Sequence, residues 1–74
     1  MEKRYKIEIK AFGKKLRDLR RERGLSQLDL ELESGLNRTE ISRIENGLKN
    51  IEFATIVKLA IALEADLKDL FNST

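Results

Sequence analysis

Apolar residues of the N-terminal third recur at helical spacing. Phe12, Leu16 and Leu19 follow one another at intervals of four and three, which predicts a helix with one buried face. Residues 1–10 are ambiguous, because they continue this stripe upstream and also alternate apolar and polar side chains as a strand does. We expect the helix to extend upstream to about Ile7; the alternatives for residues 1–10 are a basic arm or a short strand.

Four segments further along the chain carry the signature of a helix start. Ser26, Asn37 and Asp66 each combine an N-cap side chain with a carboxylate three residues later and with apolar flanking residues. A weaker start lies at Glu52, whose side chain is a poor cap. The glycines near these segments occupy positions typical of turns: Gly24, Gly35 and Gly47.

Residues 28–33 alternate leucine with acidic residues, and alternation alone would indicate a strand. The capping signature at Ser26 and the terminating Gly35 instead bracket a segment of helical length, and no neighbouring segment offers a partner strand. We therefore expect a short helix between them.

Together these signals predict an all-α domain of five helices, of roughly 14, 9, 9, 11 and 6 residues, over residues 11–71. The fourth helix, residues 53–63, is apolar on nearly every side and must be covered by more than one neighbour. Residues 72–74 are expected to form a frayed C-terminus.

The composition narrows the chemistry that this domain can perform. The chain has 74 residues, enough for one domain, and it contains no Cys and no His, which excludes thiolate and imidazole catalysis, disulfides and thiolate zinc sites. No carboxylate pair or phosphate-binding glycine loop suggests catalysis, so we expect no enzymatic activity, metal, cofactor or small-molecule ligand. The longest apolar run, residues 59–63, is far shorter than a membrane span, so we expect a cytoplasmic protein without membrane contact.

The formal net charge of +2 conceals a segregation of charge along the chain. Residues 1–24 hold ten Lys or Arg and four Asp or Glu, whereas residues 25–74 hold five and nine. A net charge of +6 beside one of −4 is typical of a domain with one edge that faces a polyanion. On charge alone, a solvated basic helix face is the preferred explanation of the same numbers, because such faces are common.

Two short helices joined by a turn, the second with a polar side, form a candidate helix-turn-helix unit. The motifs in and around this unit are Phe12-Gly13, Leu16-Arg17, Leu19-Arg20, Gly24-Leu25-Ser26-Gln27, Ser34-Gly35-Leu36, Ile41-Ser42-Arg43-Ile44-Glu45-Asn46-Gly47, Leu59-Ala60, Ala62-Leu63, Leu67, Leu70 and Phe71. With these motifs the chain resembles the Xre family, the Cro and lambda-repressor-like helix-turn-helix regulators. The resemblance covers about residues 11–71 and implies the compact five-helix fold of that family.

The resemblance also implies a sequence-specific regulator of transcription that binds double-stranded DNA, with a recognition helix at about residues 37–46 in the major groove. The family's base-reading positions then correspond to Asn37, Arg38, Thr39, Ser42 and Arg43. We expect Arg38 and Arg43 to read bases, because a guanidinium can bond both O6 and N7 of guanine. Asn37 fits an N-cap role equally well, and Ser42 fits a role as a small residue that gives clearance to DNA.

Other family positions surround the recognition helix. The residues that the resemblance assigns to the DNA backbone are Arg17, Gln27, Asn46 and Lys49. Arg20 and Glu45 stand where the family pairs an arginine of the first helix with a glutamate that ends the third, so we expect this ion pair to hold the fold. The chain departs from the family pattern at Glu31, where Ala is usual, and at Glu64, where Gly is usual. A buried, unpaired Glu31 would be costly, so we expect that it reaches solvent or a basic partner, or that the helix packing opens locally.

A homodimer on a pseudo-palindromic operator is implied as well, with Ile61, Leu67 and Phe71 as candidate contacts between subunits. A second interpretation starts from the acidic segment 28–33. Leu28 and Leu32 map to family positions that face away from the core. Three alternatives stand for this pair: scattered surface leucines of the ordinary kind, a contact with a second protein, or a module that binds proteins instead of DNA.

Overall fold

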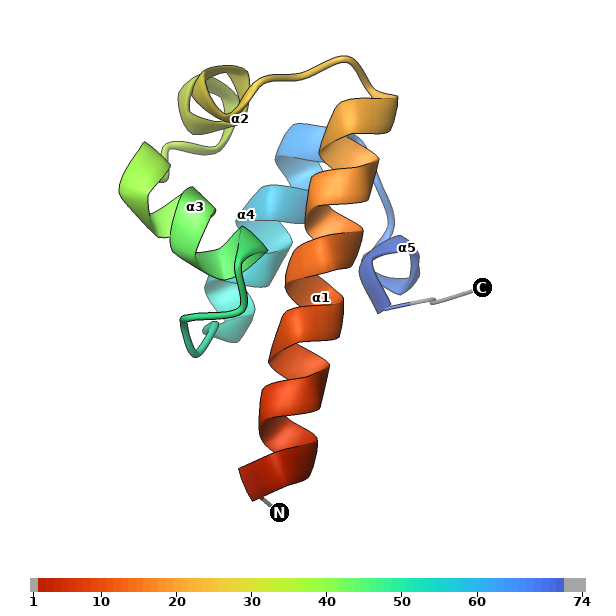
Figure 1. The fold of residues 1–74 in the computed structure, drawn as a ribbon. Helices are drawn as coiled ribbons and strands as arrows, with labels where there is room; N and C mark the ends of the chain where they lie inside the picture. The colour runs from red at the N-terminus through yellow and green to blue at the C-terminus, as the bar shows by residue number, and fades with distance from the viewer. Residues whose placement is uncertain (1, 72–74) are drawn as a thin grey trace.

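The computed structural model describes residues 2–71, which form five α-helices (Figure 1). They are α1 (Glu2–Glu22), α2 (Gln27–Ser34), α3 (Arg38–Glu45), α4 (Phe53–Leu63) and α5 (Leu67–Phe71). The predicted all-α fold of five helices is confirmed, and α2 is helical despite its alternating sequence. The predicted frayed C-terminus, residues 72–74, lies outside the described residues, as does residue 1.

The first helix is longer than predicted. It begins at Glu2, upstream of the start expected near Ile7, so a basic arm or short strand over residues 2–10 is wrong and an extension of the helix is right. Ion pairs between side chains one turn apart stabilise this first part of α1: Arg4 Nε lies 2.9 Å from Glu8 Oε2, and Lys6 Nζ lies 3.6 Å from Glu2 Oε1. In Figure 1 this first part of α1 projects beyond the other helices.

One core joins the five helices of residues 2–71. α1 packs against α3 and α5, while α2 packs against α3 and α4. The periodic residues of the first helix are buried, as predicted, and so are Leu30, Leu36, Ile41 and Ile44 of the helix-turn-helix unit. The buried apolar set is Phe12, Leu16, Leu19, Leu30, Leu36, Ile41, Ile44, Leu59, Ala60, Leu63 and Leu70.

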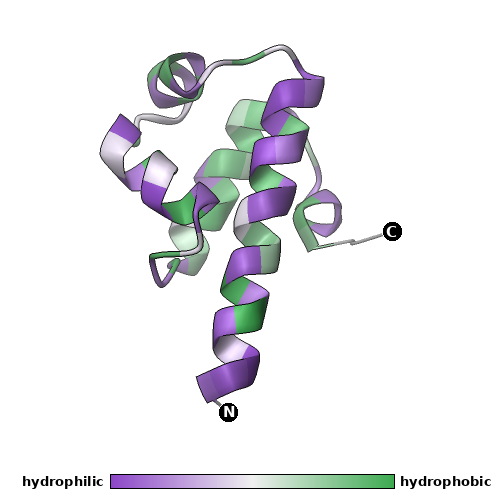
Figure 2. Ribbon diagram, viewed as in Figure 1, coloured by the Kyte–Doolittle hydropathy of each residue, from purple (hydrophilic) through white to green (hydrophobic). Residues whose placement is uncertain are grey.

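The apolar helix α4 is covered by α2 and α5, in agreement with the need for more than one neighbour. Figure 2 shows α4 as hydrophobic along most of its length, whereas α1 is banded. Phe53 and Ile61 nevertheless remain exposed at its surface. Within residues 2–71, no helix combines the length and the apolar character needed to cross a membrane.

Two of the four helix starts read from the sequence, at Ser26 and Asn37, are present as side-chain caps. The Asp29 N–H donates to Ser26 Oγ at 3.0 Å, and the Ser26 N–H donates to Asp29 Oδ2 at 2.8 Å, which completes a capping box at α2. Asn37 caps α3, since its side-chain oxygen accepts the N–H of Glu40 at 2.7 Å. Glu52, the poor cap, makes no side-chain hydrogen bond at the start of α4.

Two helices end in a residue with the left-handed backbone conformation, one in glycine and the other in a residue with a side chain. Gly35 ends α2 with φ of 79°, a conformation in which glycine carries no Cβ penalty. Glu64 ends α4 with φ of 54° and ψ of 43°, and it is the non-glycine residue with positive φ among residues 2–71. The departure from Gly at this position therefore places a strained side chain at the turn before α5.

Candidate nucleic-acid interface

The second and third helices form the helix-turn-helix unit. α2 ends at Ser34, the backbone reverses at Gly35, and α3 starts after its cap Asn37. Leu30 and Ile41 are completely buried between the two helices and the rest of the core, which fixes α3 with one face inward. The opposite face of α3 is consequently free to meet a ligand.

The candidate base-reading residues lie together on that outer face. Arg38, Thr39 and Arg43 are exposed, and Ser42 is half-buried beside them. Two shallow surface hollows join them to neighbouring polar residues: one is lined by Asn37, Thr39, Glu40, Arg43 and Lys49, the other by Gln27, Arg38, Thr39, Ser42 and Arg43. The residues from the two helices thus form one continuous polar surface.

Asn37 belongs to this surface and also caps the helix. Its Oδ1 accepts the N–H of Glu40, so the N-cap alternative is correct, while the residue itself remains exposed. Lys49, in the loop after α3, lies with its Nζ 3.6 Å from Glu40 Oε2. These contacts hold the edge of the polar surface without burying it.

A buried carboxylate, Glu45, anchors the end of α3. Arg20 Nε donates to Glu45 Oε2 at 2.7 Å and Arg20 Nη2 to Glu45 Oε1 at 3.0 Å, which is the ion pair expected between these residues. Gln27 Nε2 donates to Glu45 Oε1 at 3.1 Å, and Arg20 Nη1 donates to the Leu25 carbonyl at 2.8 Å. This cluster joins α1, α2 and α3 at one point.

The charge state of the cluster follows from its contacts. Burial acts to raise the pKa of Glu45, but hydrogen bonds from Arg20 and Gln27 outweigh it, and the pKa lies below its ordinary value. The same pairing raises the pKa of Arg20, against the effect of its own burial. The carboxylate is therefore ionised at neutral pH and held by cations.

Two residues assigned to the DNA backbone contact each other. Arg17 Nη2 donates to Asn46 Oδ1 at 2.9 Å and to the Glu45 carbonyl at 3.2 Å. Asn46 Nδ2 in turn donates to the Ser42 carbonyl at 2.8 Å, with Ser42 Oγ at 3.5 Å. Sequence reasoning missed this chain of contacts from α1 to the outer face of α3, because its partners are far apart in sequence.

A close approach between α1 and α3 was also missed. A Cβ added at Gly13 would meet the Ile44 carbonyl oxygen most closely and would lie 2.8 Å from the Glu45 carbonyl oxygen, so both approaches are inside van der Waals contact. Gly13 is buried, and the backbones of the two helices meet there. The only signal in the sequence is a glycine in the middle of a predicted helix, where it is otherwise unfavourable.

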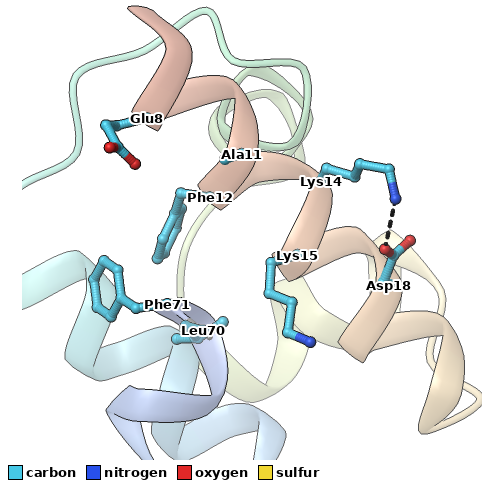
Figure 3. Close-up of a pocket in the computed structure, with 8 residues that line it drawn as sticks. All are labelled: Glu8, Ala11, Phe12, Lys14, Lys15, Asp18, Leu70 and Phe71. Atoms are coloured by element: carbon cyan, nitrogen blue, oxygen red, sulfur yellow. Dashed lines mark hydrogen bonds and ion pairs between the residues drawn. The ribbon is translucent and has the colours of Figure 1, made fainter. Parts of the chain in front are cut away.

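The candidate subunit contacts are unequally exposed. Ile61 is 71% exposed and Phe71 60% exposed, whereas Leu67 is half-buried against the core. Figure 3 shows the Phe71 ring beside Phe12 in a groove between α1 and α5, and their ring centroids are 5.4 Å apart. Lys14 and Lys15 line the same groove.

The outer surface of α2 carries the expected leucine pair. Leu28 is 47% exposed and Leu32 75% exposed. Glu31 is half-buried, and within residues 2–71 no buried side-chain nitrogen or oxygen lacks a hydrogen-bond partner. Glu31 therefore has partial access to solvent, which is one of the alternatives expected for it.

Known proteins are similar to this chain in sequence and in fold. The family model for helix-turn-helix domains (HTH_3) matches residues 16–70. Control protein C.MunI from Mycoplasma sp. is 39% identical over 62 residues, 82% of this chain and 84% of that protein. Control protein C.BamHI from Bacillus amyloliquefaciens is 41% identical over 64 residues, 85% of this chain and 79% of that protein.

A solved structure agrees with these relatives. The restriction-modification controller protein C.AhdI from Aeromonas hydrophila superimposes with a TM-score of 0.83 at 41% identity, over 85% of this chain and 96% of that one. The sequence, the helix-turn-helix geometry and these likenesses agree: the chain belongs to the helix-turn-helix family HTH_3, that of the Xre and Cro-like regulators.

Proposed function

We propose that this protein regulates transcription by binding double-stranded DNA sequence-specifically as a homodimer. The observation that carries the proposal is the continuous polar surface of α2 and α3, on a helix-turn-helix unit whose recognition helix is anchored by the buried Arg20–Glu45 pair. A rigid helix with exposed hydrogen-bonding side chains is the element that enters a major groove.

Arg38 and Arg43 are the proposed readers of guanine. Both guanidinium groups are exposed on α3, where each can donate two parallel hydrogen bonds to O6 and N7. Exposed Thr39 is proposed to touch a thymine methyl group or a phosphate, and Asn37 and Ser42 are proposed as further base contacts. Bidentate pairs of this kind contribute roughly 1–3 kcal/mol of discrimination each.

The phosphate contacts are proposed at the rim of the reading surface. Gln27 opens α2 and Lys49 lies in the loop after α3, so their polar groups flank the recognition helix on two sides. Arg17 and Asn46 lie at the same rim, where their mutual hydrogen bond would orient both toward a phosphate. Contacts to phosphate fix the register of a protein on DNA, while base contacts carry the sequence information.

A twofold dimer is proposed to bind a pseudo-palindromic operator. Ile61 and Phe71 expose apolar surface on α4 and α5, and half-buried Leu67 lies on α5 as well. A twofold interface would place two recognition helices about 34–36 Å apart, one turn of DNA. Three similar proteins are described as control or controller proteins, so we propose a comparable regulatory role, exercised in the cytoplasm at this protein's own promoter.

The acidic outer surface of α2 supports a second candidate function. Leu28 and Leu32 are exposed between acidic residues, an arrangement that fits a protein with a basic, apolar groove. A module that binds only proteins would use this surface and leave α3 unoccupied. The two functions therefore differ in which helix a partner protects.

A selection from randomised duplexes tests the main proposal. The purified protein should enrich one sequence with inverted-repeat symmetry, and sedimentation should give the mass of two chains per operator. The affinity should fall steeply with salt, because neutralised phosphates release counterions. An Arg38→Ala/Arg43→Ala double variant is the control for base reading. No enrichment, or binding that ignores ionic strength, would exclude sequence-specific DNA binding.

A further inference from the structure

The first part of α1 lies outside the range that defines the family. The family match starts at residue 16, whereas α1 starts at Glu2 and projects past the other helices (Figure 1). This projection is rich in Lys and Arg, yet neither the core nor the recognition helix uses it.

Three lysines of the projection lie on one stripe of α1. The stripe comprises Lys3, Lys6, Lys10, Gly13 and Arg17, which follow one another at intervals of three and four, so they share one helix face. The three lysines, here called the lysine stripe, span about 10 Å of helix at 1.5 Å per residue. All three are exposed.

Contacts further along the stripe show which part of the molecule it faces. Gly13 approaches the Glu45 carbonyl at the end of α3, and Arg17 donates to the side chain of Asn46. Lys10 lies against Gly47, where an added Cβ would meet the lysine Cα at 3.0 Å. The stripe therefore runs past the C-terminal end of α3 and the loop that follows it, and the lysines continue beyond that loop.

The charges of the lysine stripe are little compensated by carboxylates within residues 2–71, as are those of Lys15 and Arg21 elsewhere on the helix. Off the stripe, Arg4 is held by Glu8 at 2.9 Å and Lys14 by Asp18 at 3.0 Å. On the stripe, Lys6 has a loose, exposed contact of 3.6 Å with Glu2, and Lys3 and Lys10 make no ion pair with any residue in the range 2–71. An uncompensated row of cations beside a phosphate-facing loop matches the negative row of phosphates on a DNA strand.

We propose that the lysine stripe binds DNA backbone phosphates next to those contacted by the loop after α3. The inference rests on the proposed function and extends its footprint, since α1 adds contacts that a domain starting at residue 16 would lack. These contacts carry no sequence information, so they strengthen binding to the operator and to unrelated DNA alike. They also assign a role to the basic charge concentrated in residues 1–24.

A matched pair of triple variants tests the lysine stripe. Lys3→Gln/Lys6→Gln/Lys10→Gln and the control Lys15→Gln/Lys58→Gln/Lys68→Gln both change the formal net charge from +2 to −1, so the two variants differ only in where the charges are removed. Affinity for a random-sequence duplex of about three helical turns is measured across salt by fluorescence anisotropy. Circular dichroism and thermal melting show that each variant folds.

The stripe variant should bind at least about tenfold more weakly than the control at 0.1 M salt, and its log–log salt slope should be shallower by between about 1 and 3. A Lys3→Arg/Lys6→Arg/Lys10→Arg variant should restore wild-type affinity and slope. On the selected operator, neutral methylphosphonate linkages should weaken the wild-type protein at one cluster of positions and leave the stripe variant unaffected there.

Equal affinities and slopes for the stripe variant and its control would overturn the inference while leaving DNA binding itself intact. Failure of the wild-type protein to bind any duplex would instead overturn the proposed function. The two failures are distinguishable, because only the second removes binding by the unmutated chain.

Discussion

Arg20 on α1 donates two hydrogen bonds, of 2.7 and 3.0 Å, to Glu45 at the end of α3, although the residues are 25 positions apart in sequence. The arginine side chain is 9% exposed and the glutamate 1%, so water competes little for either group. The orientation of the recognition helix relative to α1 depends on this pair more directly than on any contact within α3 itself.

Removing the arginine should therefore be severe. In Arg20→Met the Glu45 carboxylate keeps Gln27 and the more distant Arg17 but loses its main cation, and we expect a loss of about 3–5 kcal/mol in the free energy of unfolding. Urea denaturation at pH 7 measures it. The matched control Arg21→Met, at the next and exposed position, should change stability by less than about 0.5 kcal/mol. Similar losses in both variants would show that the pair is dispensable.

Acid should weaken the same connection. The pKa of Glu45 is lower in the folded chain than in the unfolded one, because hydrogen bonds from Arg20 and Gln27 overcome the opposing effect of burial. Its stabilising contribution is thus complete above the ordinary glutamate pKa of about 4.3 and is lost as pH falls through the folded value. The difference in stability between the wild type and Glu45→Gln should narrow on acidification.

Asp29 provides the control for this titration. Hydrogen bonds to Ser26 lower the pKa of Asp29 as well, so it also loses stabilising interactions in acid, but it does so in both proteins. Subtracting the two pH profiles, each measured by thermal melting, isolates Glu45. If the stability difference between the wild type and Glu45→Gln stayed constant from pH 7 to well below the ordinary glutamate pKa, Glu45 would not be the group that titrates.

Gly13→Ala should test the close approach of α1 and α3 by the sign of its effect. In an open helix this change stabilises by up to about 1 kcal/mol, because alanine is the better helix former. At Gly13 the new methyl group meets the Glu45 carbonyl, so we expect a destabilisation of about 1–3 kcal/mol from overpacking. Denaturant unfolding measures the change, and a gain in stability would disprove the contact.

Glu64→Gly should stabilise the protein. Glu64 holds a left-handed conformation with φ of 54°, and glycine would relieve about 1 kcal/mol of strain, reduced by its greater freedom in the unfolded chain. The control Glu64→Ala removes the carboxylate but keeps a Cβ, so it should show no comparable gain. A rise in melting temperature for alanine equal to that for glycine would indicate a charge effect instead.

Arg43→Ala should relax sequence preference. Loss of a bidentate contact to guanine would remove roughly 1–3 kcal/mol of discrimination at one base pair, while binding to unrelated DNA falls much less. Competition with single-base variants of the selected operator measures both quantities. Lys68→Ala, which removes the same charge from α5, is the control. If Arg43→Ala loses more affinity than the control but loses it equally on every sequence, Arg43 is a phosphate contact and not a reader. A loss no larger than that of Lys68→Ala would show that Arg43 does not contact the DNA.

Local sequence signals were sufficient for most of the fold. The capping box at Ser26 outweighed the alternating pattern of residues 28–33, because a hydrogen-bonded cap and a terminating Gly35 constrain the backbone more than side-chain alternation does. The start of α1 was placed too late for the converse reason. Residues 2–10 bury little apolar surface, so this part of the helix depends on ion pairs between side chains one turn apart. The spacing of apolar residues gives no sign of such ion pairs.

Long-range contacts explain what the sequence could not predict at the candidate site. Arg17 and Asn46 were both assigned to the DNA backbone, but their contact with each other joins residues 29 positions apart and depends on how α1 crosses α3. That crossing is set by Gly13, whose role is visible only when both backbones are placed. The exposed arginines of α3, in contrast, were assigned from the family resemblance, which depends on local motifs and not on how the helices cross.

Because Glu45 is buried, salt and acid should affect different parts of this protein. Dissolved ions screen exposed charges within about 10 Å at 0.1 M, but they reach a 1% exposed carboxylate poorly. A rise in ionic strength should accordingly weaken the interactions of the exposed lysines and arginines, whereas a fall in pH should weaken the buried Arg20–Glu45 pair. A chain built in this way can be detached from a polyanion by salt while it keeps its shape, ready to bind again on dilution.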